Sequence, residues 1–339
     1  MTGPQPVRWH RPLLWFAAAM GVLALVSLVG IFVDDRLVVG SPTWLKPFKF
    51  AVSMGVYAVT LAWLLRAARR GRRTGWWAGT VVAVAATVEM ALIVLQGVRG
   101  RPSHFNNSTP FDETVWSLMG NLVVVLWTAS LVVAIVVAFQ RGGDPVLKSA
   151  ARLGFTLSLA GMLVAFLMTQ PTAEQDAALD RGETVGIIGA HSVGVADGGP
   201  AMPVTGWSTT GGDLRVAHFA GIHALQALPL LALLLAAAAR RRPSSVPGEQ
   251  QAARGRLSSV LGEQRVARGL VRAAALGYGG LIALLTWQAL RGQPLLDPDG
   301  RTLLAAGVLA VTVLCAAGIA LRGRGRTPIE EKSPAIVGA

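Results

Sequence analysis

The chain has 339 residues, of which 53% are hydrophobic and only 14% are charged, and its formal net charge is +13. Soluble domains carry about 25% charged residues, so this composition excludes an ordinary soluble enzyme. The single cysteine, Cys315, excludes an intrachain disulfide and a cysteine-based metal site.

Hydropathy predicts an all-α fold, a polytopic transmembrane helical bundle with about eight spans. Each apolar segment is long enough, at about 1.5 Å per residue, to cross a hydrocarbon layer of about 30 Å. Because backbone polar groups inside lipid must pair within the segment, we expect every span to be a helix. The predicted spans cover residues 13–33, 48–66, 76–98, 114–140, 151–171, 214–239, 271–290 and 302–321.

The positive charges are distributed unevenly along the chain. Most of the 31 Lys and Arg residues fall in the termini and in the even-numbered connections between spans. By the positive-inside rule, we expect both termini to be cytoplasmic in a multi-pass protein of the plasma membrane. The basic excess then indicates contact with anionic membrane lipids, and no nucleic-acid partner is expected.

Composition divides the chain into four regions. The stretch after the sixth span is polar, and its sequence Ser244–Gly255 recurs as Ser258–Gly269, which indicates a flexible basic cytoplasmic linker. We expect a six-span core at 1–239 with an acidic outer loop at 172–212, the linker at 240–270, a two-span appendage at 271–322 and a cytoplasmic tail at 323–339.

Polar side chains inside the predicted spans indicate a site, because hydrocarbon disfavours them unless they face a partner or a cavity. The topology places one such group from each of four spans near the middle of the membrane. We expect Glu89 to act as the acid or base and His223 to be its proton partner. Tyr57 and Asn121 are expected to orient the substrate in the same catalytic centre.

A second set of polar residues lies nearer the outer edge, and we expect it to bind the substrate in a pocket that opens outward. Its basic members could hold an anionic head group. In the sixth span, Asp213 is expected to cap the helix and Pro229 to bend it. The predicted substrate-binding residues are Lys49, Gln96, Arg99, His104, Arg215, His218 and Gln226.

Other short motifs receive simpler interpretations. His218 and His223 lie about 140° apart on an ideal helix, so they do not form a metal-binding pair. A zinc site would need His104 or His191 from a loop together with a histidine of the sixth span, and a haem would need one or two axial histidines. No metal ligand is assigned and the cofactor is left open, with a haem- or metal-binding membrane protein kept as a further alternative. The pair Ser103-His104 is interpreted as a loop cap, and Asp197 as part of a tight turn.

These features support three hypotheses. The first is a membrane-embedded enzyme that uses acid–base chemistry on a lipid or isoprenoid-like substrate. The second is a proton-coupled transporter or solute-binding membrane protein in which Glu89 and His223 exchange protons. The third is a structural partner for another membrane protein, with the polar groups fixing helix register.

The segment Trp207–Gln226, together with Arg101–Asn106 and Pro47–Phe50, resembles an uncharacterised family of bacterial multi-span membrane proteins. The resemblance covers about the first six spans and implies no activity for any residue. Alkaline-ceramidase-like hydrolases also combine Ser, Asp and His on a helical bundle, but the histidine spacing here departs from their paired histidines.

Overall fold

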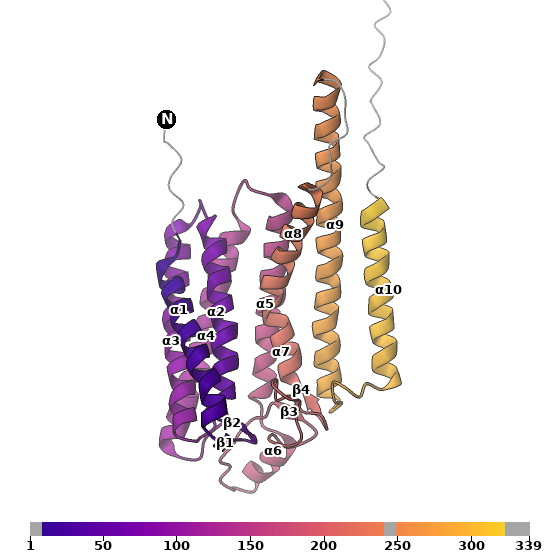
Figure 1. The fold of residues 1–339 in the computed structure, drawn as a ribbon. Coiled ribbons are helices and arrows are strands. Elements are labelled where there is room, and N and C mark those ends of the chain that lie inside the picture. Colours follow the sequence, from indigo (N-terminus) through magenta and orange to yellow (C-terminus); the bar gives the residue numbers. More distant parts are fainter. Residues whose placement is uncertain (1–8, 241–248, 323–339) are drawn as a thin grey trace, which may run out of the picture.

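The computed structural model describes residues 9–240 and 249–322, and within them the chain forms a bundle of long helices (Figure 1). The expected all-α architecture is confirmed. The long helices are α1 (Arg11–Val33), α2 (Leu45–Arg66), α3 (Arg72–Val98), α4 (Pro110–Ala138), α5 (Pro145–Met168), α7 (Leu214–Ile222), α8 (Ala224–Arg240), α9 (Glu249–Leu290) and α10 (Gly300–Arg322).

Seven of these helices are each long and apolar enough to cross a membrane, and α7 and α8 meet the same criterion only when taken together as one bent pair. Six predicted spans coincide with single helices to within about six residues; the span at 214–239 corresponds to α7 and α8 together, and the span at 271–290 covers only the latter part of α9. The starts of two helices follow from capping residues that the sequence carries just before them. Thr109 caps α4 and Asp144 caps α5, and in both cases a proline occupies the first turn.

The sixth span bends by 44° between α7 and α8. Asp213 caps α7 as expected, since its side chain accepts a hydrogen bond from the backbone of Arg215. The break lies at His223 and therefore precedes Pro229, where we expected the bend; Pro229 lies inside α8. The correction has a physical reason: a proline frees a carbonyl one turn before itself, so the distortion falls ahead of the proline.

Helix α9 is longer than the sequence suggested. It begins at Glu249, so the part of the expected linker from residue 249 to 270 is helical, while residues 241–248 and the expected tail at 323–339 lie outside the described residues. The glycines and serines of the repeat indicated a linker, but Ala, Arg, Glu and Gln, all good helix formers, outweigh them. The hydroxyl of Tyr278 in this helix donates to the carbonyl of Ala220 at 2.7 Å, which ties α9 to α7.

The connections gather at two ends of the bundle (Figure 1). We call the loop end the one formed by residues 34–44, 99–109, 169–213 and 291–299; it carries α6 (Ala173–Asp180) and both small sheets. In these sheets the strands pair antiparallel: β1 (Leu37–Val38) with β2 (Ser41–Pro42), and β3 (Ser192–Val193) with β4 (Gly212–Asp213).

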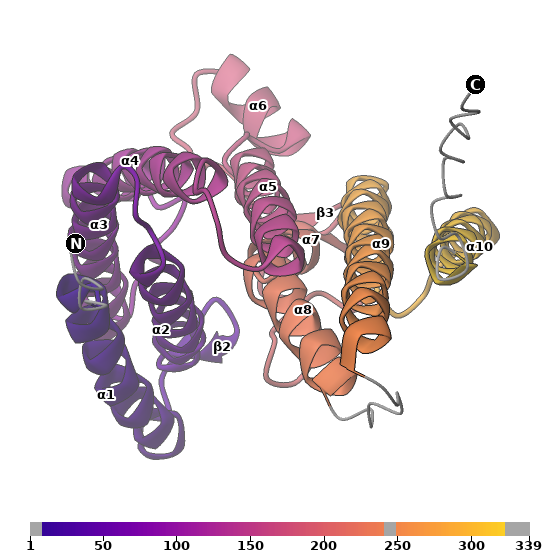
Figure 2. The same ribbon diagram turned by 90° about the horizontal axis from the view of Figure 1, so that it is seen from above.

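Seen along the bundle, α1 to α4 group together, and α5, α8, α9 and α10 follow on the other side (Figure 2). The main apolar core lies among α1 to α4 and reaches α5 and α8 through Phe155 and Leu225. A smaller core, which includes Ala150, Leu228 and Val271, joins α5, α8 and α9. The space between the two groups of helices is where the cavity described below lies.

Helices α5 and α7 approach each other through two glycines. A Cβ atom built on Gly221 would overlap the Cα of Gly161, so neither position has room for a side chain. Small residues allow such backbone approach between helices in membranes. This packing sets the position of α7, and thereby of Arg215 and His218.

We therefore expect Gly221→Ala to destabilise the protein by about 1–3 kcal/mol, the usual cost of overpacking. The matched control is Gly21→Ala in α1, where an added Cβ meets nothing within 4 Å. That substitution should leave stability unchanged or raise it slightly, since alanine is the better helix former. Thermal unfolding in detergent compares the two; equal melting temperatures would contradict the close α5–α7 contact.

Candidate functional site

A cavity of about 960 Å³ lies between the two groups of helices and extends to the loop end. Its walls come from α2, α3, α4, α5 and α7, and the loops after α1, α3 and α5 contribute to its polar end. Pockets for small ligands have about 300–1,000 Å³, so this cavity has room for a large one.

The part of the cavity within the helices is mainly apolar. Side chains of α2, α3, α4 and α5 form it, with few polar groups among them. An apolar lining of this kind can bind a hydrocarbon chain. The apolar lining includes Met54, Ile93, Met119, Leu122, Leu126, Trp127 and Met162.

Three of the four residues that we expected at the catalytic centre line this cavity: Glu89, Tyr57 and His223. Glu89 is 3% exposed, and its Oε2 has no hydrogen-bond partner within the described residues. The hydroxyl of Tyr57 donates to the hydroxyl of Ser130 at 2.7 Å. The structure thus places a carboxyl without a full set of partners in the wall of a mostly apolar space.

His223 ends α7, and its Nδ1 lies 3.3 Å from Oε1 of Gln226, whose amide lies 3.3 Å from the hydroxyl of Thr60. In the described part of the chain, no hydrogen bond joins His223 to Glu89. The two residues therefore share the cavity without forming the direct proton pair that we expected.

The fourth expected residue, Asn121, does not reach the cavity. Its side chain is exposed and donates to the carbonyl of Ser117, one turn earlier, at 2.8 Å. Ser117 and Thr128, which share its stripe, are also exposed. The prediction was wrong because the amide pairs with its own helix, which makes an outward-facing position tolerable.

Gln96 and Arg99, which we predicted to bind the substrate, do not line the cavity either. Both contact Asp112, whose side chain is completely buried: the amide of Gln96 donates to Oδ1 at 2.9 Å and Nη1 of Arg99 lies 2.6 Å from the same atom. Thr109 donates to the other carboxylate oxygen at 2.8 Å. This group connects α3 to the start of α4 outside the cavity, so it is not free to bind a substrate head group.

The sequence around Asp112 carries a signal for this role. An apolar run preceded by Thr109-Pro110-Phe111-Asp112 is typical of a helix start. At such a start, an acidic residue three positions after the cap can accept hydrogen bonds from backbone N–H groups that have no partner within the helix. The remaining predicted binding residues do line the cavity: Lys49, His104, Arg215, His218 and Gln226.

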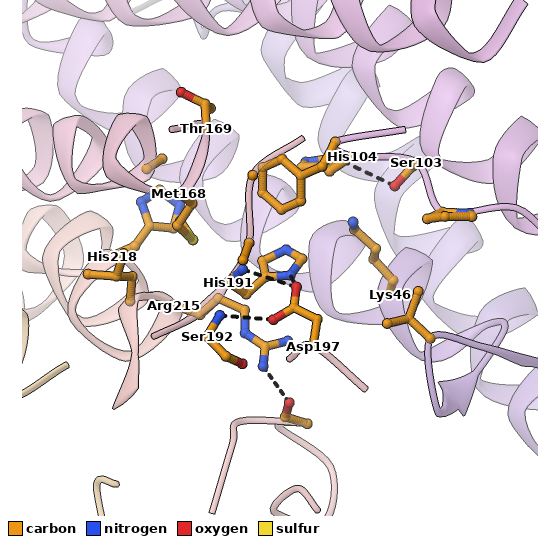
Figure 3. Close-up of a pocket in the computed structure, with 18 of the residues that line it drawn as sticks. Lys46, Ser103, His104, Met168, Thr169, His191, Ser192, Asp197, Arg215 and His218 are labelled. Atoms are coloured by element: carbon orange, nitrogen blue, oxygen red, sulfur yellow. Dashed lines mark hydrogen bonds and ion pairs between the residues drawn. The ribbon is translucent and has the colours of Figure 1, made fainter. Parts of the chain in front are cut away.

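The polar end of the cavity contains a histidine–aspartate pair that sequence reasoning missed (Figure 3). Nδ1 of His191 lies 2.7 Å from Oδ2 of Asp197. The same carboxylate accepts hydrogen bonds from the backbone N–H groups of His191, at 3.0 Å, and Ser192, at 2.9 Å. Asp197, which we interpreted as part of a tight turn, thus orients the imidazole of His191.

The charge state of this pair follows from its surroundings. Burial raises the pKa of Asp197, but hydrogen bonds from His191 and from the backbone outweigh it, so the pKa lies below its ordinary value. Burial lowers the pKa of His191 more than Asp197 raises it. An ionised carboxylate only accepts, so the proton of the neutral ring is on Nδ1 and Nε2 keeps a free lone pair.

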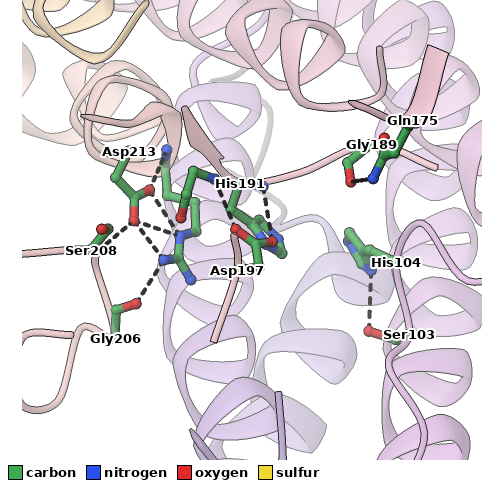
Figure 4. Close-up of polar contacts among 11 residues, drawn as sticks. Ser103, His104, Gln175, Gly189, His191, Asp197, Gly206, Ser208 and Asp213 are labelled. Atoms are coloured by element: carbon green, nitrogen blue, oxygen red, sulfur yellow. Dashed lines mark hydrogen bonds and ion pairs between the residues drawn. The ribbon is translucent and has the colours of Figure 1, made fainter. Parts of the chain in front are cut away.

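The loop that carries His191 is held on both sides. Strand β3, which starts at Ser192, pairs with β4, and the backbone of Leu214 donates to the carbonyl of His191 at 3.1 Å. On the other side, Gln175 of α6 accepts from the N–H of Gly189 at 2.8 Å and donates to its carbonyl at 3.1 Å (Figure 4). A Cβ at Gly189 would lie 2.7 Å from the ring of Phe105, so only glycine fits.

Phe105 connects this loop to a second histidine. Its ring centroid lies 4.9 Å from that of His191 and 6.1 Å from that of His104. The hydroxyl of Ser103 lies 3.1 Å from Nδ1 of His104, so these two side chains contact each other, whereas the sequence was interpreted as a loop cap. Burial lowers the pKa of His104 well below its ordinary value, and the charge of Lys46 lowers it further.

Four basic residues line the cavity: Lys46, Lys49, Arg101 and Arg215. Arg101 is exposed and, within the described residues, forms no side-chain hydrogen bond or ion pair, whereas Lys49 and Arg215 are engaged. Lys49 donates to the carbonyl of Thr205 at 2.6 Å. Arg215 forms an ion pair with Asp213 at 2.5 Å (Figure 4). Lys46, in the first turn of α2, is not engaged either: within residues 9–240 and 249–322 no hydrogen bond or ion pair engages its amine, which is directed toward the space beside His104 and His191 (Figure 3).

No group of three or more His, Cys, Asp or Glu side chains in the described part of the chain is arranged to hold a metal ion. A scan against protein-family models, a search of curated proteins and a search of solved structures each gave no match. The class is therefore defined by the fold and the cavity alone. The chain is an all-α bundle of long apolar helices, as multi-span membrane proteins are, with a large cavity that is apolar between the helices and polar at the loop end.

Proposed function

We propose that the protein is an enzyme of the plasma membrane that acts on a lipid-like substrate with an anionic head group. Its termini would be cytoplasmic and its loop end would face outward, as the distribution of Lys and Arg favours. The observation that carries the proposal is the placement of the His191–Asp197 pair and the unengaged Lys46 at the polar end of a cavity whose remainder is apolar.

The cavity supports a definite orientation of such a substrate. Its hydrocarbon chain would occupy the space lined by Met54, Met119 and Leu126, where burial of each CH₂ group contributes about 0.8 kcal/mol. The head group would then lie at the loop end beside Lys46. A charge-assisted contact there is stronger than a neutral hydrogen bond.

His191 is suited to act as a general base in this orientation. Its Nε2 can accept a proton from a water molecule while the water oxygen attacks the carbon or phosphorus of a lipid ester. The ester bond then breaks, and the imidazolium returns the proton to the departing oxygen. Lys46 would stabilise the negative charge that develops on the ester oxygen, and Asp197 would hold the ring in the reactive tautomer.

Of the residues expected at the catalytic centre, Glu89 remains in the proposal. Its buried carboxyl lies in the wall of the cavity, and Oε2 has no hydrogen-bond partner among the residues that the structure describes, so a polar group in the substrate could bind to it. His223 and Gln226 would contact the substrate on the α7–α8 side of the cavity. Tyr57 contributes to the cavity wall while its hydroxyl pairs with Ser130.

The test is to reconstitute the purified protein in nanodiscs with a total lipid extract in water labelled with ¹⁸O and to follow the lipids by mass spectrometry. We expect one class of lipid ester to disappear with time and ¹⁸O to enter one of its products. An unchanged lipid profile over many hours, with folded protein and several extracts, would contradict the proposal.

One observation favours the transporter as a second candidate. The span that contains His223 is broken at that residue, and interrupted helices near the membrane centre form the binding sites of many transporters. Glu89 could then exchange protons with the cavity. Substrate flux into proteoliposomes that requires a proton gradient and is lost in Glu89→Gln, without chemical change of the substrate, would support this alternative over the enzyme.

A further inference from the structure

A second pocket, of about 550 Å³, lies between α5 and α9 at the end of the bundle opposite the loop end. Four basic side chains line it: Lys148 and Arg152 from α5, and Arg268 and Arg272 from α9. Among the described residues, no carboxylate lines the pocket and no ion pair involves any of the four basic side chains. Within that part of the chain, the pocket is thus a concentration of positive charge without counter-charge.

The four basic side chains repel one another both within each helix and across the pocket. Each helix carries its two basic residues one turn apart, an arrangement in which like charges destabilise a helix. The two pairs then face each other across one pocket. Arg152 donates to the carbonyl of Ala138, and Arg268 donates to that of Gln264 at 3.4 Å, but neither contact compensates charge. An anion in the pocket would remove repulsion in both helices at once.

The surroundings indicate where the anion comes from. Leu153 lines the pocket, and the buried side chains of Val146, Ala150 and Val271 form the apolar core directly beneath. The pocket also lies in the first turns of α5, and on α9 its residues Arg268 and Arg272 lie where the polar stretch of the sequence gives way to the apolar stretch at 271–290. It therefore sits at the boundary between polar and apolar regions, which is the level of lipid phosphates.

We propose that this pocket binds the phosphate-bearing head group of an anionic phospholipid from the membrane leaflet at that end. The phosphate would lie among the four cations, and an acyl chain would follow the apolar groove between α5 and α9. Basic pockets between helices on the cytoplasmic side of membrane proteins bind lipid head groups by this physics. The site is separate from the cavity at the loop end and does not depend on the function proposed for it.

The test compares the wild type with Lys148→Gln/Arg272→Gln, which removes one charge from each helix. The probes are phosphatidylglycerol, cardiolipin, phosphatidylcholine and inorganic phosphate, added to delipidated protein in detergent and followed by native mass spectrometry and thermal unfolding. We expect the wild type to bind the two anionic lipids preferentially, and the double variant to bind them about thirtyfold more weakly, since each basic residue contributes about 1 kcal/mol.

The matched control is Arg72→Gln/Arg73→Gln, which removes two exposed charges at the same end of the bundle but outside the pocket. This control should keep wild-type affinity. Without lipid, Lys148→Gln/Arg272→Gln should unfold at or above the wild-type temperature, because it relieves repulsion; this shows that it folds. Equal weakening in both double variants, equal affinity of the wild type for phosphatidylcholine, or inorganic phosphate binding as tightly as the lipids would overturn the proposal.

Discussion

Replacing His191 by alanine should reduce turnover of the lipid substrate by about 100- to 10,000-fold, the usual contribution of a positioned general base. The substitution removes the only ring nitrogen that the Asp197 contact leaves free for proton transfer at this position. Affinity for the substrate should change little, because Lys46 and the apolar wall bind it. Single-turnover rates and equilibrium binding, measured separately, distinguish the two effects.

The partner substitution, Asp197→Asn, gives a pH signature that a purely structural role would not produce. In the wild type the rate should rise with pH as His191 loses its proton, and the rise should be centred below pH 6.5 because burial lowers the pKa of this ring. The carboxylate raises that pKa, so its removal should move the rise to still lower pH. The plateau should fall because the ring becomes a weaker base and loses its fixed tautomer.

The matched control for this pair is Asp34→Asn. Asp34 also lies at the loop end and forms an ion pair, with Arg36 at 2.6 Å, but it does not line the cavity. Its removal should leave the rate and the pH profile unchanged. If His191→Ala and Asp197→Asn retain full activity with an unchanged profile, the base lies elsewhere, and Glu89 becomes the residue to test.

The helices could be predicted because hydropathy and span length are local properties of the chain. The same holds for the capping role of Asp213, which depends only on the residues around it. Depth along each helix was also informative: Glu89, Tyr57 and His223 do line a common cavity. The expectation for these residues rested on their depth along each helix, which follows from topology and rise per residue alone.

The rotation of each helix about its own axis was not predictable in this way. Ser117, Asn121 and Thr128 form a stripe as expected, but the stripe faces away from the cavity. Angles within one helix give the relative directions of its side chains, and only contacts with neighbours determine which direction is inward. Asp112 is an example of such a contact. Gln96 and Arg99 form hydrogen bonds with its buried carboxylate and therefore do not face the cavity.

The long loop at residues 172–212 was the least predictable part, because its conformation depends on contacts with distant segments. A Cβ at Gly40 would lie 2.7 Å from the carbonyl oxygen of Gly198, so the hairpin after α1 packs directly against this loop. A Cβ at Gly212 would overlap the carbonyl oxygen of Ala289 in α9. Such contacts bring His191 to Asp197, and no spacing in the sequence indicates them.

Lys46→Gln should weaken the binding of an anionic amphiphile by about 10- to 150-fold, as expected when a charged hydrogen bond worth about 1.5–3 kcal/mol is lost. The reason is that its amine faces the cavity and, unlike Lys49 and Arg215, takes part in no hydrogen bond or ion pair within the described residues. Dodecyl phosphate and dodecanol, compared by calorimetry in nanodiscs, separate the head-group contribution from that of the chain.

The head-group dependence is what makes this prediction specific. Dodecanol should bind the wild type and Lys46→Gln equally, since the apolar wall at Met119 and Leu126 is unchanged. Lys46→Arg should keep most of the affinity for dodecyl phosphate, because it keeps the charge. Equal losses for both amphiphiles in Lys46→Gln would mean that the substitution distorts the cavity. Undiminished binding of dodecyl phosphate would mean that the anion binds elsewhere, for example beside Arg101, which also lines the cavity.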